Sequence, residues 1–278
     1  MLYCSRSPGD GFGIGDKNMK KIVSVLLATA IMTAFAASST GCMLSKPDVD
    51  GEYVAELDLT PIMKSAFETS LGDQGIDIDV DDFKGEVTVL YELVLDDGEY
   101  TLTIDYDSYV DSYTDYVMDN LVPVLKEEIL DQIEMYGYTE DEFLSEMGYS
   151  SMDEYCEESV LASIDTFAED LENETVEGDY RVTAGFGAAK TSVKLDNDTI
   201  LYFENGNLVG YIDEDLVDDI RDAEDLDDLK DAFEDADADS SLIDVLDMCD
   251  SYGISAEDFV DWLDDCGLLD DGLVYEAQ

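Results

Sequence analysis

The sequence contains no histidine and little positive charge. Its 278 residues include 13 Lys and Arg and 71 Asp and Glu, for a formal net charge of -58 at pH 7. Without imidazole there is no Ser-His-Asp or Cys-His pair, no His-metal site and no histidine acid–base chemistry. A hydrolase built from two carboxylates stays open, because that mechanism needs only Asp and Glu. No pair can be singled out among so many acids.

The negative charge restricts the partners that the chain can bind. Nucleic acids and anionic lipid headgroups are polyanions, so we expect neither as a partner. Cations, a basic protein or a small ligand at the surface fit the charge; solubility, mutual repulsion or adaptation to salt would explain it with no ligand at all. Hydrophobic residues make up 45% of the chain, with 17 Tyr and 10 Phe, which is enough for a folded core and unlike a disordered polyacid.

Long hydrophobic runs are also scarce, and the strongest lies near the N-terminus. Met19, Lys20 and Lys21 precede an apolar stretch over residues 22–37, and small residues follow up to Gly41. A membrane-spanning helix needs about 20 apolar residues, so this stretch is short for a permanent anchor. The order of its zones is typical of a secretory signal peptide over residues 19–41. We interpret residues 1–18 as lying upstream of the true start.

The end of this signal resembles the lipobox of bacterial lipoproteins. In "SSTGC", Thr40, Gly41 and Cys42 match the last three places of that motif, whereas Ser39 stands where an aliphatic residue is usual. The resemblance implies cleavage between Gly41 and Cys42 and a diacylglyceryl group on the Cys42 thiol. It also implies an extracytoplasmic protein anchored to the outer face of the cell membrane. Residues 42–49 would then be the lipidated cysteine and a short polar tether.

Three cysteines remain beyond Cys4 and Cys42. They are Cys156, Cys249 and Cys266, an odd number, so at least one thiol is free or intermolecular. Cys249 and Cys266 fall in neighbouring helical segments and could pair; the alternative is that all three are small apolar side chains on helix faces. No CxxC or other metal-type spacing occurs, and we expect no cofactor.

From residue 50 onward, alternating polar and apolar residues predict short strands. The first strand places four apolar side chains on one face: Tyr53, Ala55, Leu57 and Leu59. Two further strands flank the turn at 96–98, and three or four more follow within 179–212. About seven short antiparallel strands favour a small barrel or curved sheet in an α+β fold.

A helical insert over 108–172 interrupts the strands of this β-rich domain, which spans 50–212. Thr139 with Glu142, and Ser151 with Glu154, have capping-box spacing. Pro123 must either kink the first helix or begin a second one. The strand-and-turn style of "LDDGEYTLTI" and "ILYFENGNLV" resembles small lipocalin-like domains of bacterial lipoproteins, which implies a barrel whose mouth binds a small ligand.

The segment 213–278 is dense in Asp, yet its apolar residues keep helical spacing. We predict short amphipathic helices with a frayed C-terminal end; a wholly disordered acidic tail is the alternative.

One acidic cluster suggests a metal site. Asp77, Asp79 and Asp81 stand at alternate positions, but an EF-hand loop needs Gly and Glu where this chain has Asp82 and Thr88. We interpret the cluster as a solvated acidic loop, with loose binding of divalent ions as the alternative.

An aromatic stripe is the other candidate binding feature. Its members are spaced three, four and three apart, on one face of the predicted helix: Tyr106, Tyr109, Tyr113 and Tyr116. Such rings could stack on a sugar or a cationic ligand; packing in the core is the alternative. Lys190 and Lys194, on a predicted strand, would neutralise carboxylates or mark a ligand pocket.

Together these features favour a secreted, lipid-anchored cell-surface protein with a non-enzymatic binding or structural role, and we expect a monomer. The alternatives are a lipocalin-like small-ligand binder and a two-carboxylate glycoside hydrolase.

Overall fold

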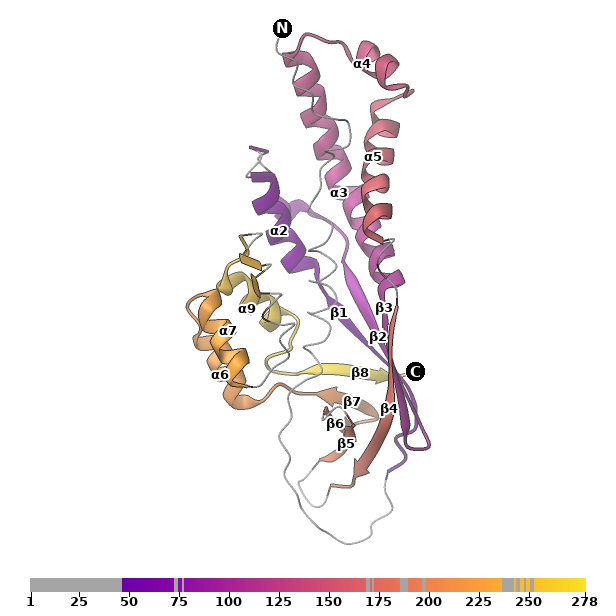
Figure 1. The fold of residues 1–278 in the computed structure, drawn as a ribbon, viewed down its shortest axis with the longest axis vertical. Helices are drawn as coiled ribbons and strands as arrows, with labels where there is room; N and C mark the ends of the chain where they lie inside the picture. Colours follow the sequence, from indigo (N-terminus) through magenta and orange to yellow (C-terminus); the bar gives the residue numbers. More distant parts are fainter. Residues whose placement is uncertain are drawn as a thin grey trace.

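The computed structural model describes residues 47–278, with gaps at 73–74, 77, 169–170, 172, 186–189, 197–198, 237–242, 244–245, 248 and 251–252. Eight strands form a closed antiparallel barrel in sequential order (Figure 1). They are β1 (Gly51–Asp58), β2 (Thr88–Asp96), β3 (Glu99–Asp105), β4 (Glu174–Thr183), β5 (Thr191–Leu195), β6 (Ile200–Glu204), β7 (Asn207–Gly210) and β8 (Leu273–Ala277). The predicted α+β fold class with an antiparallel barrel is confirmed.

Alternation along the strands builds the barrel core. On β1, Tyr53, Ala55 and Leu57 are buried, whereas Glu52 and Glu56 are exposed, as the sequence pattern predicts. The same alternation in β2 and β3 buries Val89, Tyr91, Leu93, Leu95, Tyr100, Leu102 and Ile104. Each large apolar side chain removed from water in this way contributes roughly 1.5–3 kcal/mol to folding.

The C-terminal strand corrects one part of the sequence interpretation. The barrel has eight strands, in keeping with the predicted number of about seven, but the expected frayed end is wrong, because residues 273–277 form β8. This strand pairs with β7 on one side and with β1 on the other, where Val54 faces Glu276. Its five residues follow a run of acidic helices, so pairing with β7 and with β1, both distant in the sequence, identifies it as a strand.

Between β3 and β4 the chain forms a projecting arm of three helices (Figure 1). They are α3 (Tyr106–Met135), α4 (Glu140–Met147) and α5 (Met152–Ala168), so the predicted helical insert is confirmed. Pro123 lies inside α3 and begins no second helix. At 1.5 Å per residue, α3 is about 45 Å long. The arm has its own small core, separate from that of the barrel, made of Val122, Ile133, Leu144, Met152 and Cys156.

Side-chain caps fix the starts of the two distal helices of the arm. Thr139 accepts from the backbone N–H of Glu142, whose carboxylate accepts in return, so the predicted capping box is confirmed. Ser151 likewise accepts from the N–H of Glu154 at 3.2 Å. The Glu154 carboxylate, however, accepts from the N–H of Ser150 at 2.9 Å, one residue earlier than a standard capping box places it.

A further helix, α2 (Thr60–Gly72), is not anticipated by the sequence interpretation. Asp58 accepts from the Thr60 N–H at 2.8 Å, and the Thr60 hydroxyl accepts from the N–H of Val87, also at 2.8 Å. These two hydrogen bonds fix the start of α2, and the second joins it to Val87, the residue just before β2. Phe67 is 1% exposed and anchors the helix in the main core. The short 3₁₀-helix η1 (Val80–Asp82) follows.

The acidic C-terminal segment packs on the barrel. It contains α6 (Glu214–Asp222), α7 (Leu226–Asp235) and α9 (Ala256–Asp265). Their apolar faces join the main core through Leu216, Ile220, Leu229, Phe233, Phe259 and Trp262. Ser255 and Asp258 form a reciprocal capping box at the start of α9. The predicted amphipathic helices are therefore confirmed, and a wholly disordered tail is wrong.

The barrel has a defined polarity along its length. The chain enters β1 at Gly51, opposite Leu95 and next to the β2–β3 turn. The Tyr180 hydroxyl donates to Asp50 at this same end, and the Tyr53 hydroxyl donates to the carbonyl of Val49 at 2.8 Å. β3 runs from that turn to the other end of the barrel and continues directly into α3. The arm therefore projects from the end opposite residues 47–51 (Figure 1).

Candidate functional site

The tyrosine stripe lies on one face of α3, as predicted, and this face is turned into the core. The four rings are between 0% and 5% exposed: Tyr106, Tyr109, Tyr113 and Tyr116. Tyr113 and Tyr116 stack on Phe67 of α2, with ring centroids 6.5 and 6.3 Å away, and Tyr109 stacks on Tyr113 at 5.8 Å. A sugar or cation could reach these rings only by entering the core.

Inside the barrel, two further tyrosines flank a small residue. Ala55 on β1 faces Tyr91 on β2, and the register between β1 and β8 sets Ala55 beside Tyr275. Tyr91 in turn faces Ile104, and Tyr275 faces Leu208. All five are between 0% and 6% exposed. Because alanine is small, both phenol rings fit at this level, and the interior is filled there by side chains.

Burial keeps the interior phenols protonated. It raises the pKa of Tyr91 well above the ordinary value of 10.0, and the nearby Tyr275 and Tyr106 hydroxyls raise it further. Burial raises the pKa of Tyr275 and of Tyr109 as well. The hydroxyls of Tyr91 and Tyr116 have no hydrogen-bond partner among the residues that the structure describes. A buried hydroxyl without a partner costs free energy, so a polar group reaching Tyr91 would recover it.

The described residues of the acidic cluster do not form a metal site. Asp77 lies outside the described residues. Asp79 accepts from the N–H of Asp81 at 3.2 Å and caps η1. Across 47–278, apart from the gaps given above, no three His, Cys, Asp or Glu side chains gather so that they could hold a metal ion.

Lys190 belongs to a polar and aromatic cluster on the barrel surface. It pairs with Glu204 and donates to the Tyr211 hydroxyl at 3.1 Å, and that hydroxyl donates to Glu204 at 2.8 Å. Its ammonium lies 4.4 Å from the centroid of the Tyr211 ring. The pairing raises the pKa of Lys190 and lowers that of Glu204. Lys190 therefore neutralises a carboxylate. In the strand register, Lys194 on β5 lies opposite Arg181 on β4.

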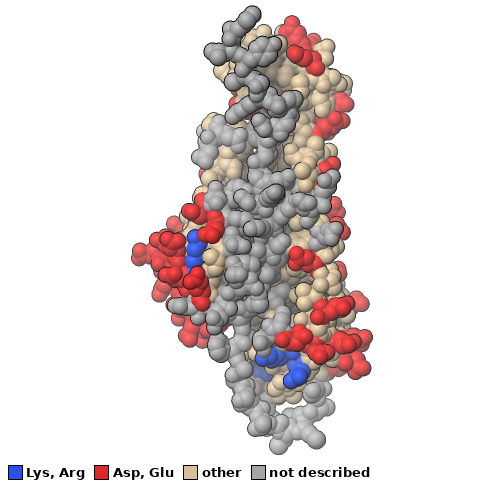
Figure 2. All heavy atoms as spheres, viewed as in Figure 1, with Lys and Arg blue, Asp and Glu red and all other residues tan. Residues whose placement is uncertain are grey.

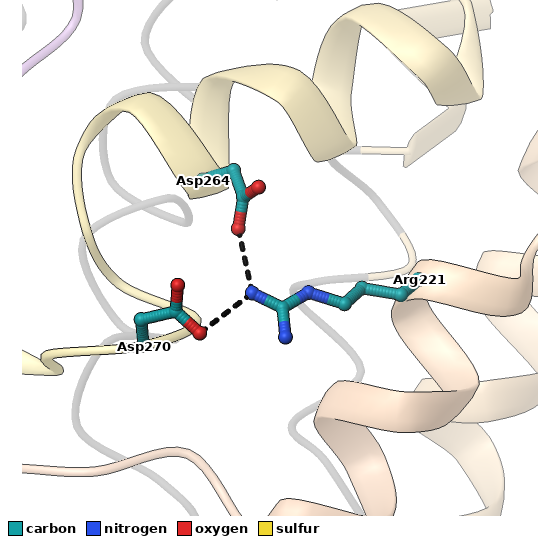
Figure 3. Close-up of polar contacts among 3 residues, drawn as sticks. All are labelled: Arg221, Asp264 and Asp270. Atoms are coloured by element: carbon teal, nitrogen blue, oxygen red, sulfur yellow. Dashed lines mark hydrogen bonds and ion pairs between the residues drawn. The ribbon is translucent and has the colours of Figure 1, made fainter.

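Arg221 connects the helices that precede β8. Its Nη2 lies 2.8 Å from a carboxylate oxygen of Asp264 on α9 and 2.7 Å from one of Asp270 (Figure 3). The two carboxylates raise the pKa of Arg221. All three side chains are more than a third exposed, so the contribution of each pair is small. The contact ties α6 to α9 and to the segment that leads into the closing strand.

The three cysteines of the described body are free thiols. Cys156 and Cys249 are buried, and Cys266 donates to the carbonyl of Asp58 at 3.1 Å. Burial raises the pKa of Cys249 and of Cys266 to about 12. The pairing of Cys249 with Cys266 that the sequence left open is not formed, and both side chains serve as small apolar groups in the core.

Charge is spread unevenly over the surface. Figure 2 shows Asp and Glu gathered over the C-terminal helices and along the opposite edge, with Lys and Arg in two small groups. Among the residues described, no helix is both long and apolar enough to cross a bilayer. Gly41 and Cys42, the predicted cleavage and lipidation positions, lie outside the described residues.

Comparison of the chain with protein-family models, with curated proteins and with solved structures finds no match.

Sequence reasoning alone misses two of these features. The row of Tyr91, Ala55 and Tyr275 depends on strand register across the barrel closure. The contact of α2 with the tyrosine face depends on Phe67, which comes from a helix that alternation did not signal. The sequence carries one signal of the first feature. The alternation of polar and apolar residues along β1 and β2 places Ala55 and Tyr91 on the buried faces of their strands.

Proposed function

We propose that this protein is a secreted, lipid-anchored, extracytoplasmic protein with a non-enzymatic binding role. In this proposal Cys42 carries the lipid, the barrel is the rigid base, and the helical arm is held away from the membrane. The observation that carries the proposal is the polarity of the fold. The chain joins the barrel at Gly51, and α3 leaves from the opposite end.

The path of residues 47–51 supports this arrangement. Val49 is 2% exposed, and its carbonyl accepts a hydrogen bond from the Tyr53 hydroxyl. The chain is therefore attached to the barrel from Val49 onward, which leaves six residues, 43–48, between the barrel and Cys42. Six extended residues span at most about 20 Å. An anchor at Cys42 would thus keep the entry end near the membrane, with α3, which is about 45 Å long, directed away from it.

The filled interior supports a scaffold role for the barrel. An eight-stranded barrel is just wide enough either to be filled by side chains or to hold one small ligand. Here Tyr91 and Tyr275 occupy the middle level on either side of Ala55. The proposal assigns no catalytic residue, in keeping with the histidine-free composition of the chain.

A lipocalin-like small-ligand binder is the second candidate. The observation that favours it is the buried Tyr91 hydroxyl, which lacks a hydrogen-bond partner in the described part of the chain. A ligand with one polar group and an apolar body would satisfy that hydroxyl. A thermal-shift screen with fatty acids, sugars and calcium tests it. Binding at the barrel raises the melting temperature for one ligand class, and Tyr91→Phe reduces that shift; no shift with any class rules the candidate out.

Metabolic labelling with an alkyne analogue of palmitate tests the anchor. The wild type and Cys156→Ala, a control at a free thiol of the described body, should both be labelled and should fractionate with membranes. Cys42→Ala should be unlabelled and released. Labelling that persists in Cys42→Ala, or that is missing from the wild type, contradicts the proposal.

A further inference from the structure

The distal end of the arm carries the largest exposed apolar side chains of the described molecule. Met135 is 73% exposed, Tyr136 75% and Tyr138 54%. We call these three residues the tip patch. Large apolar side chains gathered at one exposed place are typical of an interaction surface.

The tip patch is held by a hydrogen-bonded turn. The N–H of Tyr136 donates to the carbonyl of Gln132 at 3.1 Å, and the N–H of Tyr138 donates to that of Ile133, also at 3.1 Å. Gly137 between them has a φ of 77°, a value that an L-residue rarely adopts. The Thr139 capping box then starts α4. The two tyrosine rings are therefore presented on an ordered turn.

Exposed acidic residues flank the tip patch in the sequence, and no base is near it there. Asp131, Glu134, Glu140, Asp141 and Glu146 are all exposed. The chain has no Lys or Arg between residues 127 and 180. A second copy of this chain would bring like charges together, and an anionic lipid surface would be repelled in the same way.

We propose that the tip patch binds a basic protein, one that presents Lys or Arg beside apolar side chains. This inference rests on the binding role proposed above and adds the surface and the partner class; it does not depend on the lipid. The carboxylates pair with the partner's cations. The faces of Tyr136 and Tyr138 take a guanidinium or ammonium by cation–π contact. Met135 adapts to its apolar groups.

A labelled amphipathic peptide of Lys and Leu is the probe, titrated into the purified intact protein with fluorescence anisotropy as the readout. Tyr136→Ser combined with Tyr138→Ser should weaken binding at least about tenfold, because central aromatic residues dominate interface energies. The matched control combines Leu161→Ser on α5 with Val94→Ser on β2; both residues are 37–38% exposed and lie outside the patch. This control should bind like the wild type.

Charge is tested separately. Glu134→Gln with Asp141→Asn should weaken binding and reduce its salt dependence, whereas Asp218→Asn with Asp219→Asn on α6 should not. A peptide of Lys and Ser, which keeps the charge without the apolar groups, should bind more weakly than the Lys and Leu peptide. A peptide of Glu and Leu should not bind.

Equal weakening by the tip variants and their controls would overturn the proposal, since it would mean general attraction to an acidic protein. Wild-type affinity in the tyrosine variant would overturn it too. Circular dichroism melts establish that each variant is folded. Because the titration does not use the lipid, its outcome is independent of the palmitate labelling. If the protein is not labelled by palmitate but still binds the peptide at the tip, the lipid-anchor proposal fails and the proposal of a basic protein partner stands.

Discussion

Gly178 lets two side chains meet across the barrel wall. Tyr100 on β3 faces Gly178 on β4, and the Tyr100 hydroxyl donates to Asp196 at 2.9 Å. A Cβ added at Gly178 would lie 2.5 Å from an Asp196 carboxylate oxygen and 2.7 Å from the Tyr100 ring. The glycine is therefore required by close approach, and its φ is not in the left-handed region.

Gly178→Ala should lower the free energy of unfolding by about 1–3 kcal/mol, since the Tyr100–Asp196 contact must shift to admit the methyl group. The control is Gly72→Ala at the end of α2, where nothing lies within 4 Å of an added Cβ; it should be neutral or stabilising. Urea titration of both variants measures the difference. Equal stability of the two would contradict this account of Gly178.

Buried tyrosines make stability sensitive to alkaline pH. Burial, with help from Asp196, raises the pKa of Tyr100 to about 12; burial, with help from Asp50, does the same for Tyr180. A pKa above the unfolded value of 10.0 stabilises the fold fully below pH 10, and this contribution is lost as pH rises toward 12.

We expect the free energy of unfolding to be insensitive to tyrosine ionisation up to about pH 10 and to fall between pH 10 and 12. Absorbance at the phenolate band should show a class of tyrosines that ionises only as the protein unfolds. Ionisation of all tyrosines in one reversible step near pH 10 would contradict the buried positions.

At the scale of elements, the arm and the barrel have separate cores. Leu144 of α4 packs with Ile133, Met152 and Cys156 in the small core of the arm, and none of these belongs to the main core. Small units of this kind open at lower free energy than the body that carries them. The distal end of the arm can therefore be loosened without unfolding the barrel.

Leu144→Ala should destabilise the arm by about 2–5 kcal/mol, the usual cost of deleting a buried leucine side chain. Hydrogen exchange should accelerate in α4 and in the distal parts of α3 and α5, whereas β1 and β2 keep their protection. Ala162→Gly on the exposed side of α5 serves as the control and should cost about 1 kcal/mol. Loss of protection in the barrel strands would show that the two cores unfold together.

How far each element could be predicted depends on how local its signal is. The alternation in β1 and the capping box at Thr139 are short-range patterns, and the structure confirms them. β8 is set by pairing with β7 and with β1, the latter more than two hundred residues away, and its five residues are too few to carry a clear pattern of their own. The tyrosine face of α3 was visible in the sequence, but Phe67, the residue that covers it, was not.

At the scale of the whole molecule, the charge of -58 opposes compaction. Only a few carboxylates of the described body form ion pairs, such as Glu204 with Lys190 and Asp264 with Arg221. Both pairs are at the surface, where each contributes little. Screening by dissolved salt is therefore the main factor that can weaken the repulsion among the carboxylates.

The melting temperature should rise steadily as sodium or potassium chloride increases from low to near-molar concentration, and the two salts should act alike. Calorimetry at constant pH measures this. Calcium at millimolar concentration should add no more than its ionic strength accounts for. A selective response to calcium would contradict the solvated interpretation of the acidic loops and would point to a site that includes Asp77, Asp79 and Asp81.

The central claim is that a lipid at Cys42 holds the barrel at the membrane while the arm points away. Energy transfer to acceptor lipids in vesicles tests it most directly, with a fluorescent amino acid placed either at Glu99, beside the β2–β3 turn, or at Tyr138 on the arm. The account predicts strong transfer from position 99, weak transfer from position 138, and none from either with Cys42→Ala. Equal transfer from the two positions, or stronger transfer from 138, would contradict it.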